Sequence, residues 1–274
     1  MLTAAVRALH REEPPPWVLD DELALLLAGG DGDEITRRLR TELPPEDLLA
    51  FSRWLCVRAR LPEDVVQQGI ANGVRQYVIL GAGLDSFAHR RGDLLERLRV
   101  FEVDHPATQA WKRLRLQELG IGHPANLTYA AVDFETQTLR DGLVAADFDF
   151  GAPAIFSWIG VTMYLTKDAI MSTLETVLAA APKSRIILTY NRPVSALESA
   201  EAGTARTLRQ ITQEMGEPFI SLFEPAEIEQ LLLKIGFVDI VHFGPTEAAR
   251  TYFQGRSDIR LHGSQYIVIA TVPE

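Results

Sequence analysis

Hydrophobic and polar positions change their spacing once along the chain, close to residue 75. Before that point, apolar residues recur at helical intervals in three segments. The segments are TAAVRALH at 3–10, DDELALLLAGG at 20–30 and EDLLAFSRWLCVRAR at 46–60. Prolines and glycines separate them, at 14–16, 29–33 and 44–45. The pattern predicts a leader made of several short helices.

Segments rich in strand-forming residues follow the leader. They cover residues 75–81, 99–104, 127–134, 153–160, 184–191, 237–244 and 265–272. Helical spacing at 108–120 and 167–181 lies between early members of the series, which predicts right-handed crossovers and a mostly parallel, buried sheet. The connection between the sixth and seventh segments has no strong helical period, so we predict that the last two strands pair antiparallel.

The length of 274 residues, with 47% hydrophobic residues, allows a large core. It fits one extended α/β domain as well as two small ones. We predict a helical cap over residues 1–70 and a single compact sheet domain over residues 71–274. The cap and residues 194–235 would form either a lid over a ligand cavity or the surface of a homodimer.

The formal net charge of −10 disfavours nucleic acids and anionic membranes, because both normally require a basic face on the protein. A small molecule is therefore the expected partner. The start of the chain lacks the apolar core of a signal peptide, and the apolar stretch at 23–30 is far shorter than the about 20 residues that span a bilayer. We predict a cytoplasmic protein without a membrane segment.

Neither metal nor cysteine chemistry is indicated. The stretch DGDEITRRLRTE at 31–42 begins like a calcium loop, but Thr36 stands where the sharp turn requires glycine. No His/Cys cluster has zinc spacing. The single cysteine, Cys56, cannot form an internal disulfide, and its apolar helix face predicts a core residue rather than a nucleophile.

The stretch GAGLDS at 81–86 directly follows the first predicted strand. Gly81 and Gly83 lack a Cβ, so the backbone can turn sharply and lie against a ligand. An isolated G-x-G is more often a simple tight turn. Here the second strand ends in Glu102 and Asp104, about twenty residues further on, where nucleoside-binding sheets keep the carboxylate that accepts from both ribose hydroxyls. This context favours a nucleoside site.

A third acid, Asp133, ends the third strand and is followed by Phe134. Its carboxylate can accept from an adenine amine while the ring packs on the base. A nicotinamide dinucleotide would need a third glycine where Ser86 stands, and Asp85 would repel its phosphates. Several acids and no phosphate cradle favour S-adenosylmethionine, which is cationic and carries no phosphate. A nicotinamide-dependent reductase remains the alternative.

Several motifs together resemble the leucine carboxyl methyltransferase family, whose bacterial members include polyketide O-methyltransferases. They are GAGLDS with the following FAHRR, VFEVDHPATQAWKRLRL at 100–116, VDF at 132–134 and SWIGVTMYLT at 157–166. The resemblance runs from about Arg53 to Thr166. It implies a class I, Rossmann-like methyltransferase fold, with seven strands in the order 3-2-1-4-5-7-6 and strand seven antiparallel.

The resemblance also implies roles for individual residues. Arg58, in VRARLPED, would bind the carboxylate of the cofactor, and the loop with Gly81, Gly83 and Asp85 would contact the cofactor through its backbone and its acid. The other implied contacts are Asp104 at the ribose, with Glu102 sharing it, and Asp133 with Phe134 at the adenine. One position departs from the family, because many members carry glutamate where this chain has Ile159.

We therefore predict an S-adenosylmethionine-dependent O-methyltransferase that acts on a carboxylate or hydroxyl of a secondary metabolite. Methyl transfer from a sulfonium is mostly a matter of alignment and exclusion of water. No catalytic residue is assigned; Tyr164, Tyr190, Arg192 and His242 are candidates, although each is more often a structural residue. Because of Ile159, a family member that binds the cofactor without transferring its methyl group is kept as an alternative.

Overall fold

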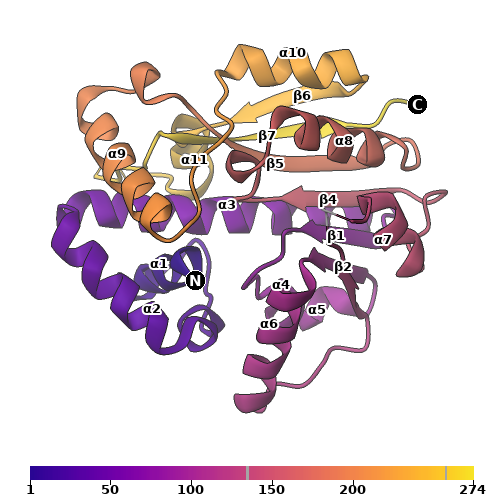
Figure 1. Cartoon of the computed structure of the whole chain (residues 1–274), viewed down its shortest axis with the longest axis horizontal. Helices are drawn as coiled ribbons and strands as arrows, with labels where there is room; N and C mark the ends of the chain where they lie inside the picture. The colour runs from indigo at the N-terminus through magenta and orange to yellow at the C-terminus, as the bar shows by residue number, and fades with distance from the viewer. Residues whose placement is uncertain (134–135, 257) are drawn as a thin grey trace.

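A seven-stranded sheet forms the centre of the molecule in the computed structural model, which describes residues 1–133, 136–256 and 258–274 (Figure 1). The strands are β1 Gln76–Leu80, β2 Arg99–Asp104, β3 Leu127–Ala131, β4 Ala154–Trp158, β5 Arg185–Asn191, β6 Val238–Phe243 and β7 Gln265–Thr271. Each strand lies within one of the segments predicted from residue type, so those seven predictions are confirmed.

The strand order is β3-β2-β1-β4-β5-β7-β6. Strands β1 to β5 pair in parallel, and β7 runs antiparallel to both β5 and β6. The predicted class I methyltransferase order and the reversed seventh strand are confirmed. In such a sheet the carboxyl ends of the parallel strands meet at one edge, where ligands bind.

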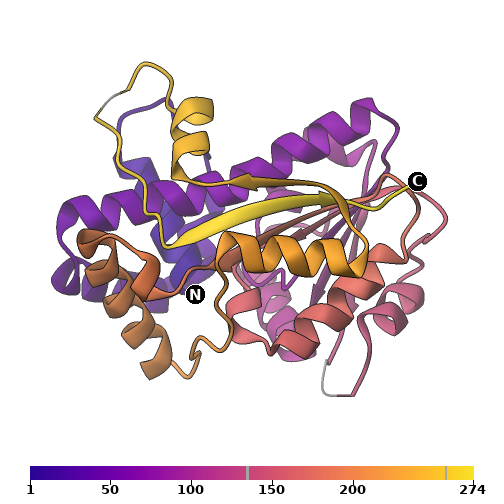
Figure 2. The same ribbon diagram turned by 90° about the horizontal axis from the view of Figure 1, so that it is seen from above.

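Helices pack on both faces of this sheet and beyond one of its ends (Figure 1, Figure 2). They are α1 Leu2–Leu9, α2 Leu23–Glu42, α3 Pro45–Ala71, α4 Phe87–Arg90, α5 Gly92–Leu95, α6 Pro106–Glu118, α7 Leu139–Ala145, α8 Lys167–Leu178, α9 Ser199–Glu214, α10 Pro225–Ile235 and α11 Pro245–Tyr252. Short 3-10 turns lie at His10–Glu12, Thr162–Tyr164 and Val194–Ala196. In the described residues no helix is both long and apolar enough to cross a membrane.

Alternate side chains of each strand enter two separate cores. In β1, Tyr77 and Ile79 pack in the layer of α3 and α11, whereas Val78 and Leu80 pack in the layer of α7, α8 and α10. This follows from the two-residue period of a strand. Figure 2 shows α3 on one side of the strands and α8 and α10 on the other, so the sheet is buried on both faces.

The three segments predicted for the leader correspond to helices α1, α2 and α3. The predicted break at GGDGD is present within α2, where Gly29 has non-helical dihedral angles, φ 62° and ψ −156°, and kinks the chain. Helix α3 runs for 27 residues, beyond the end of its predicted segment, and contains Pro62. Tertiary packing keeps α3 helical across a proline that would kink or end an isolated helix. Figure 1 shows α1, α2 and α9 beyond the end of the sheet to which β4 points.

Helix α3 belongs to two layers at once. Its first half carries Leu48 and Leu55, which pack with α1, α2 and α9, while Val66 and Ile70 in its second half pack on the sheet. The boundary predicted after residue 70 falls at the end of this helix. The division into a cap and a sheet domain stays a prediction, because α3 is continuous between them.

The connection from β6 to β7 contains a helix, α11, although its sequence has no strong helical period. Pro245 begins this helix, and the backbone N–H of Gly244 donates to Glu247 Oε2 at 2.9 Å, which caps it. Eight residues make only about two turns, too few for a clear hydrophobic period. The antiparallel pairing predicted from the connection is still found.

Candidate active site

A cavity of about 540 Å³ lies at the carboxyl ends of β1 and β4, between the sheet and the leader. Its volume is within the range of small-molecule sites. The walls come from α1, α3, the loop after β1, the start of α6, the loop after β4 and the end of α9. Their main members are Thr3, Arg7, Arg58, Gly81, Gly83, Asp85, Thr108, Trp111, Ile159, Gly160, Tyr164 and Glu217.

The two glycines after β1 carry the backbone along the cavity wall. Both have positive φ, 66° at Gly81 and 45° at Gly83, a conformation that L-residues rarely adopt. A Cβ on Gly81 would overlap with Cγ2 of Val161, whereas a Cβ on Gly83 would come no closer than 4.0 Å to its nearest neighbour, Gly81 O. Gly81 is therefore required by packing as well as by conformation, and Gly83 by conformation alone.

Replacing Gly81 with alanine is expected to lower the free energy of unfolding by about 2–4 kcal/mol, because the left-handed backbone costs about 1 kcal/mol and the overlap with Val161 adds about 1–3 kcal/mol. Gly83→Ala is expected to cost only about 1 kcal/mol. Urea unfolding measures both. Adding Val161→Ala to Gly81→Ala should recover part of the loss; equal losses for the two glycine variants would contradict this account.

Asp104 ties the end of β2 to the glycine loop. Its Oδ2 accepts from the backbone N–H of Gly83 at 2.5 Å, and its Oδ1 accepts from the N–H of His105 at 2.7 Å. His105 is the N-cap of α6 and accepts from the N–H of Ala107 through Nδ1. The carboxylate of Asp104 thus lies directly against the backbone that lines the cavity.

Neither Asp104 nor Glu102 is among the residues that line the cavity, and Glu102, unlike Asp104, does not contact the glycine loop that does. It is fully buried, and Lys112 Nζ of α6 donates to its Oε2 at 2.6 Å. Burial raises its pKa above the ordinary value for glutamate, against the effect of Lys112. The structure places Glu102 in a buried ion pair between β2 and α6, and its share in ribose binding stays a prediction without support from this geometry.

Arg58 is a buried cation that lines the cavity. It is 7% exposed, and its Nη1 donates to Gln265 Oε1 at 2.8 Å; the Gln265 amide in turn donates to Asn191 Oδ1. Within the described ranges, no carboxylate oxygen forms an ion pair with it. Burial, with a smaller effect from Arg7, lowers the pKa of Arg58 to about 10. A buried guanidinium without a carboxylate fits an anionic group of a ligand.

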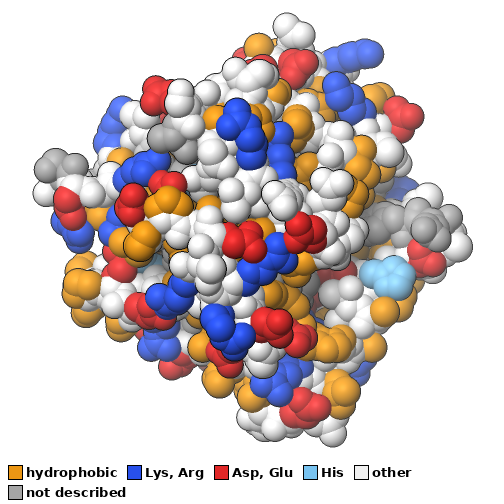
Figure 3. Space-filling view, turned by 60° about the vertical axis from the view of Figure 1, so that its left-hand side comes forward, with side chains coloured by type: hydrophobic (Ala, Val, Ile, Leu, Met, Phe, Trp, Pro, Cys, Tyr) orange, Lys and Arg blue, Asp and Glu red, His pale blue; other side chains and the backbone are white. Residues whose placement is uncertain are grey.

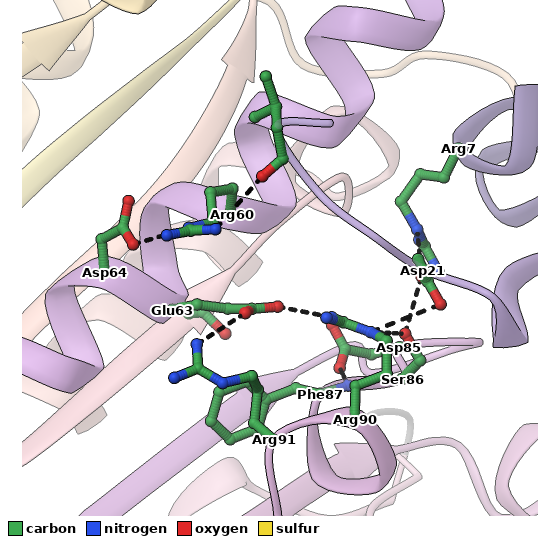
Figure 4. Close-up of polar contacts among 12 residues, drawn as sticks. Arg7, Asp21, Arg60, Glu63, Asp64, Asp85, Ser86, Phe87, Arg90 and Arg91 are labelled. Carbon is green, nitrogen blue, oxygen red and sulfur yellow. Dashed lines mark hydrogen bonds and ion pairs between the residues drawn. The ribbon is translucent and has the colours of Figure 1, made fainter. Parts of the chain in front are cut away.

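A polar network connects the loop after the glycines to Arg7 of α1, to Asp21 and to Glu63 of α3 (Figure 4). Ser86 Oγ donates to Asp21 Oδ2 at 2.8 Å, and the same carboxylate oxygen accepts from Arg7 Nε at 3.1 Å. Arg7 also donates to the carbonyl of Leu84 at 3.0 Å. Asp85, which lines the cavity, accepts from the N–H of Phe87 at 2.7 Å.

The same network reaches α3 through Glu63. Its two carboxylate oxygens accept from Arg90 at 2.5 Å and from Arg91 at 3.1 Å, and Arg90 also donates to Ser86 Oγ at 2.8 Å. Figure 4 shows Arg90 between Glu63 on one side and Asp21 with Ser86 on the other. Positive and negative side chains therefore alternate from α1 to α3, in the order Arg7, Asp21, Arg90 and Glu63.

The predicted adenine contacts are only partly described. Asp133 follows β3 and is half-buried; its backbone N–H donates to Gln137 Oε1 at 3.2 Å. It is not among the residues that line the cavity. Phe134 lies outside the described residues. Both assignments stay predictions.

Of the candidate catalytic residues, only Tyr164 lines the cavity. Burial raises its pKa to about 12, and the nearby carboxylate of Glu217 adds to the effect. The phenol is therefore protonated at neutral pH. Ile159, at the position of the family's glutamate, presents an apolar side chain to the same cavity.

The other three candidates lie apart from the cavity. Tyr190 is fully buried, and its hydroxyl is 2.9 Å from Nδ1 of His242. His242 Nε2 is 3.6 Å from a carboxylate oxygen of Glu229. Arg192 donates to the carbonyl of Ala196 at 3.0 Å. The structure gives these side chains partners in the sheet and its neighbouring helices, and their catalytic roles stay untested predictions.

Sequence reasoning identified Arg58 of the leader but missed Thr3 and Arg7 of α1, which line the cavity as well. It also missed Trp111 of α6. Helical spacing indicated these helices but not which of their faces meets the site. Cys56 is fully buried, as predicted, and burial raises the pKa of its thiol to about 12. Across the described part of the chain, no group of three or more metal-ligating side chains is placed to hold an ion.

Comparisons with known proteins agree with this arrangement. Residues 1–178 match a family model described as leucine carboxyl methyltransferase. YktD of Bacillus subtilis, named as an S-adenosyl-L-methionine-dependent methyltransferase, is 29% identical over 284 residues, which cover 94% of this chain and 91% of YktD. A relative from Frankia alni with the same kind of name is 36% identical over 196 residues, which cover 68% of this chain and 65% of that protein.

Solved structures share the fold at lower identity. A structure from Thermobifida fusca, described as a methyltransferase, has a TM-score of 0.62 at 20% identity and covers 91% of this chain and 92% of its own. A DUF574 family protein from Streptomyces avermitilis has a TM-score of 0.61 at 17% identity, covering 99% of this chain and 97% of its own. The likeness to these proteins extends over nearly the whole chain.

Proposed function

The chain belongs to the leucine carboxyl methyltransferase family, and from this premise we propose that it transfers a methyl group from S-adenosylmethionine to an oxygen of a small molecule. The cofactor class is that of the family relatives. The observation that carries the proposal is the buried, carboxylate-free guanidinium of Arg58 beside a glycine-lined cavity. The acceptor, the oxygen chemistry and a place in secondary metabolism are parts of the proposal.

The residues of the cavity fit this cofactor. A Cβ on Gly83 would meet only the carbonyl oxygen of Gly81, at 4.0 Å, so the backbone there borders open space against which a nucleoside could lie. Arg58 matches a carboxylate, and Asp85 in the lining matches a ligand that is rich in donors and carries positive charge. Asp104 lies one hydrogen bond behind the lining, at the N–H of Gly83. The N–H of Phe87 is already taken by Asp85, so the start of α4 does not offer it to a phosphate.

The chain's own contribution to the reaction is alignment. When bound, S-adenosylmethionine supplies an electrophilic methyl group on a cationic sulfur. Arg58 would hold the carboxylate at one end and Asp104 the ribose, so that the methyl group faces a fixed direction. The apolar side chains of Leu55, Ala59 and Ile159 line the same cavity and exclude water from the transfer.

A small-molecule acceptor agrees with the charge of the molecule. The net charge is −10, and the face drawn in Figure 3 carries positive and negative side chains interspersed, without a broad basic area. Nucleic acids require such an area. A homodimer and a cytoplasmic location remain predictions.

Ile159 supports one alternative, in which the protein binds the cofactor without transferring its methyl group. An apolar side chain in place of a carboxylate changes the cavity wall near the loop after β4. Methyl transfer to a panel of carboxylic acids and phenols separates the two functions. A product with labelled methyl supports transferase activity, whereas cofactor binding without any product favours the alternative.

Binding is the first test of the proposal. S-adenosylhomocysteine at about 100 times its Kd is expected to raise the free energy of unfolding by about 2.7 kcal/mol, because it binds only the folded state. NADH and NADPH should leave the unfolding curve unchanged. Stabilisation by a dinucleotide without stabilisation by S-adenosylhomocysteine would instead identify a reductase.

A further inference from the structure

The end of α9 brings Glu217 to the wall of the large cavity. Gly216, with a φ of 83°, ends the helix in a left-handed conformation. The N–H of Glu217 donates to the carbonyl of Thr212 at 2.8 Å, and the N–H of Gly216 donates to that of Gln213 at 3.0 Å. The two bonds form a Schellman motif, which satisfies the last carbonyls of a helix. The backbone of Glu217 is therefore held in place, although the residue is exposed.

The segment after Glu217 returns to the loop that follows β4. The N–H of Ile220 donates to the carbonyl of Met163 at 2.6 Å, and the rings of Phe219 and Tyr164 meet edge to face with their centroids 5.6 Å apart. Glu217 and Tyr164 line the same cavity. Burial raises the pKa of Tyr164, and the charge of Glu217 raises it further, so the carboxylate lies close to the phenol.

The two arginines of the cavity have partners once the cofactor is bound. The proposed function assigns Arg58 to the cofactor carboxylate. Arg7 forms an ion pair with Asp21 at 3.1 Å and donates to the carbonyl of Leu84 at 3.0 Å. The described lining contains no other Lys or Arg. An anionic acceptor would therefore find no unpaired side-chain cation, and it would be repelled by Glu217.

The amino group of Met1 is a further charged neighbour of Glu217. Met1 lines the cavity, and its amino group lies close enough to interact with the carboxylate. Burial lowers the pKa of this amine below its ordinary value, against the effect of Glu217, which disfavours the charged form. The amine therefore offers little compensation to an anionic acceptor.

Glu217 is also the side chain placed to accept a proton. The other carboxylate of the lining, Asp85, belongs to the loop assigned to the cofactor and accepts from the N–H of Phe87. Burial raises the pKa of Tyr77 and of Tyr164, so both phenols keep their protons at neutral pH. The described lining contains no His, Lys or Cys. A hydroxyl group that has to lose its proton would find its base in Glu217.

We propose that Glu217 is a catalytic residue, which binds a hydroxyl group of the methyl acceptor and removes its proton. This rests on the proposed function. The acceptor donates a hydrogen bond to the carboxylate of Glu217, so it is a hydroxyl compound such as a phenol and not a carboxylate. The apolar side chains of Leu55 and Ile159 line the same cavity and suit its carbon skeleton.

The reaction is a displacement coupled to a proton transfer. The hydroxyl oxygen forms a bond to the methyl carbon, while the sulfur–carbon bond breaks and leaves its electron pair on sulfur. The hydroxyl proton moves to a carboxylate oxygen of Glu217. Because Glu217 is exposed, the proton can then pass to water. General base catalysis of this kind contributes about 100-fold to 10,000-fold to a rate.

The binding test uses the full chain saturated with S-adenosylhomocysteine, at about pH 7, where phenol and benzamide are neutral and benzoate is anionic. Benzamide has nearly the shape of benzoate, so this pair isolates the charge. Calorimetric titration is expected to show phenol and benzamide binding at least about tenfold more tightly than benzoate, because a hydrogen bond to a carboxylate replaces a repulsion between two carboxylates. Benzoate binding as tight as that of the neutral probes, or no saturable binding of any probe, would overturn the proposal.

Variants assign the preference to its residue. Glu217→Gln is expected to tighten benzoate binding by about tenfold and to remove most of the preference for the neutral probes. Glu214→Gln is the matched control, because Glu214 lies in the last turn of α9, pairs with Arg38 and is not among the residues that line the cavity. An unchanged preference in Glu217→Gln, or an equal change in Glu214→Gln, contradicts the proposal. Should a variant not fold, the wild-type preference still decides it.

A comparison of two acceptors separates a base from a structural residue. Glu217→Gln is expected to slow methyl transfer to phenol by at least about 100-fold. Transfer to 4-nitrophenol, which is largely ionised at about pH 8 and needs no base, should fall by less than about threefold. An equal loss with both acceptors would show that Glu217 acts on the structure of the cavity and not on the proton.

A failure of this proposal is distinguishable from a failure of the proposed function. Calorimetry with S-adenosylhomocysteine comes first, and an absence of binding would remove the cofactor assignment itself. If S-adenosylhomocysteine binds and benzoate is preferred over the neutral probes, only the role of Glu217 fails.

Discussion

Arg58→Met is expected to lower the affinity for S-adenosylhomocysteine by about 150-fold to 4000-fold, because the cofactor carboxylate would lose its buried partner at a cost of about 3–5 kcal/mol. Calorimetric titration measures this change directly. The guanidinium is 7% exposed and has no carboxylate partner in the described residues. Solvent can therefore replace little of the lost interaction.

The apo protein should respond differently to the same change. Arg58 is buried as a cation, so methionine removes a desolvation penalty together with the hydrogen bond to Gln265. We expect the free energy of unfolding to change by no more than about 1 kcal/mol. A purely structural Arg58 would give the opposite result, with a large loss of stability and unchanged affinity in the folded fraction.

Arg60→Met is the matched control for this experiment. Arg60 lies two positions further along α3 and donates to Asp64 at 2.7 Å near the surface. The same substitution there removes a partly exposed ion pair, which contributes at most about 1 kcal/mol. Cofactor affinity should be unchanged, so a large loss of affinity in this variant would indicate a general disturbance of α3.

Lys112→Met is expected to lower the free energy of unfolding by about 3–5 kcal/mol at neutral pH, because it leaves the buried carboxylate of Glu102 without its partner. Lys112 and Glu102 are each 1% exposed in their side chains and 2.6 Å apart. Urea unfolding measures the loss. The double variant Lys112→Met with Glu102→Leu should recover most of it, since an apolar pair carries no desolvation penalty.

The loss should also depend on pH. Burial already raises the pKa of Glu102 in the folded state above its ordinary value, and removal of Lys112 raises it further. A carboxyl with a raised folded-state pKa binds a proton more readily when folded, so its contribution is favourable at low pH and is lost as pH rises through that pKa. The variant should therefore be destabilised less at about pH 5 than at about pH 8. A loss independent of pH would contradict the charge argument.

The strands were predictable because their hydrophobic runs are local signals. All residues of β1 are buried. Gly81 and Gly83 after it have positive φ, a conformation that the two glycines in the sequence indicate. The strand order came from the resemblance rather than from the pattern. Helix α11 was missed because eight residues give too little periodicity, and α3 was underestimated because Pro62 is held in place by packing on both sides.

The site was predictable where a residue's position along a strand or loop determines its surroundings. Arg58, Gly81, Gly83 and Asp85 all line the cavity. Glu102 and Asp104, on the same face of β2, do not: Glu102 pairs with Lys112 of α6, and Asp104 contacts the lining only through the N–H of Gly83. How a helix docks on a sheet depends on long-range packing, which a single sequence does not specify.

Two other groups illustrate the same limit. Tyr190 alternates into the core shared with α7, α8 and α10, so its hydroxyl meets His242 instead of the cavity. Trp54 was part of an ordinary apolar helix pattern, and His262 lay in a stretch without any periodic signal. Only the folded chain brings both residues to the wall of one small cavity.

The continuity of α3 limits how substrates can enter. A cap joined through an unbroken helix has no flexible linker about which to swing, so exchange of ligands would require displacement of α1, α2 or α9 against α3, or a bend within α3 itself. Such a bend is easiest at Pro62, which has no N–H for the carbonyl of Arg58 four residues earlier. It would move the guanidinium together with the cap, so that release of the proposed cofactor would be coupled to opening of the cavity.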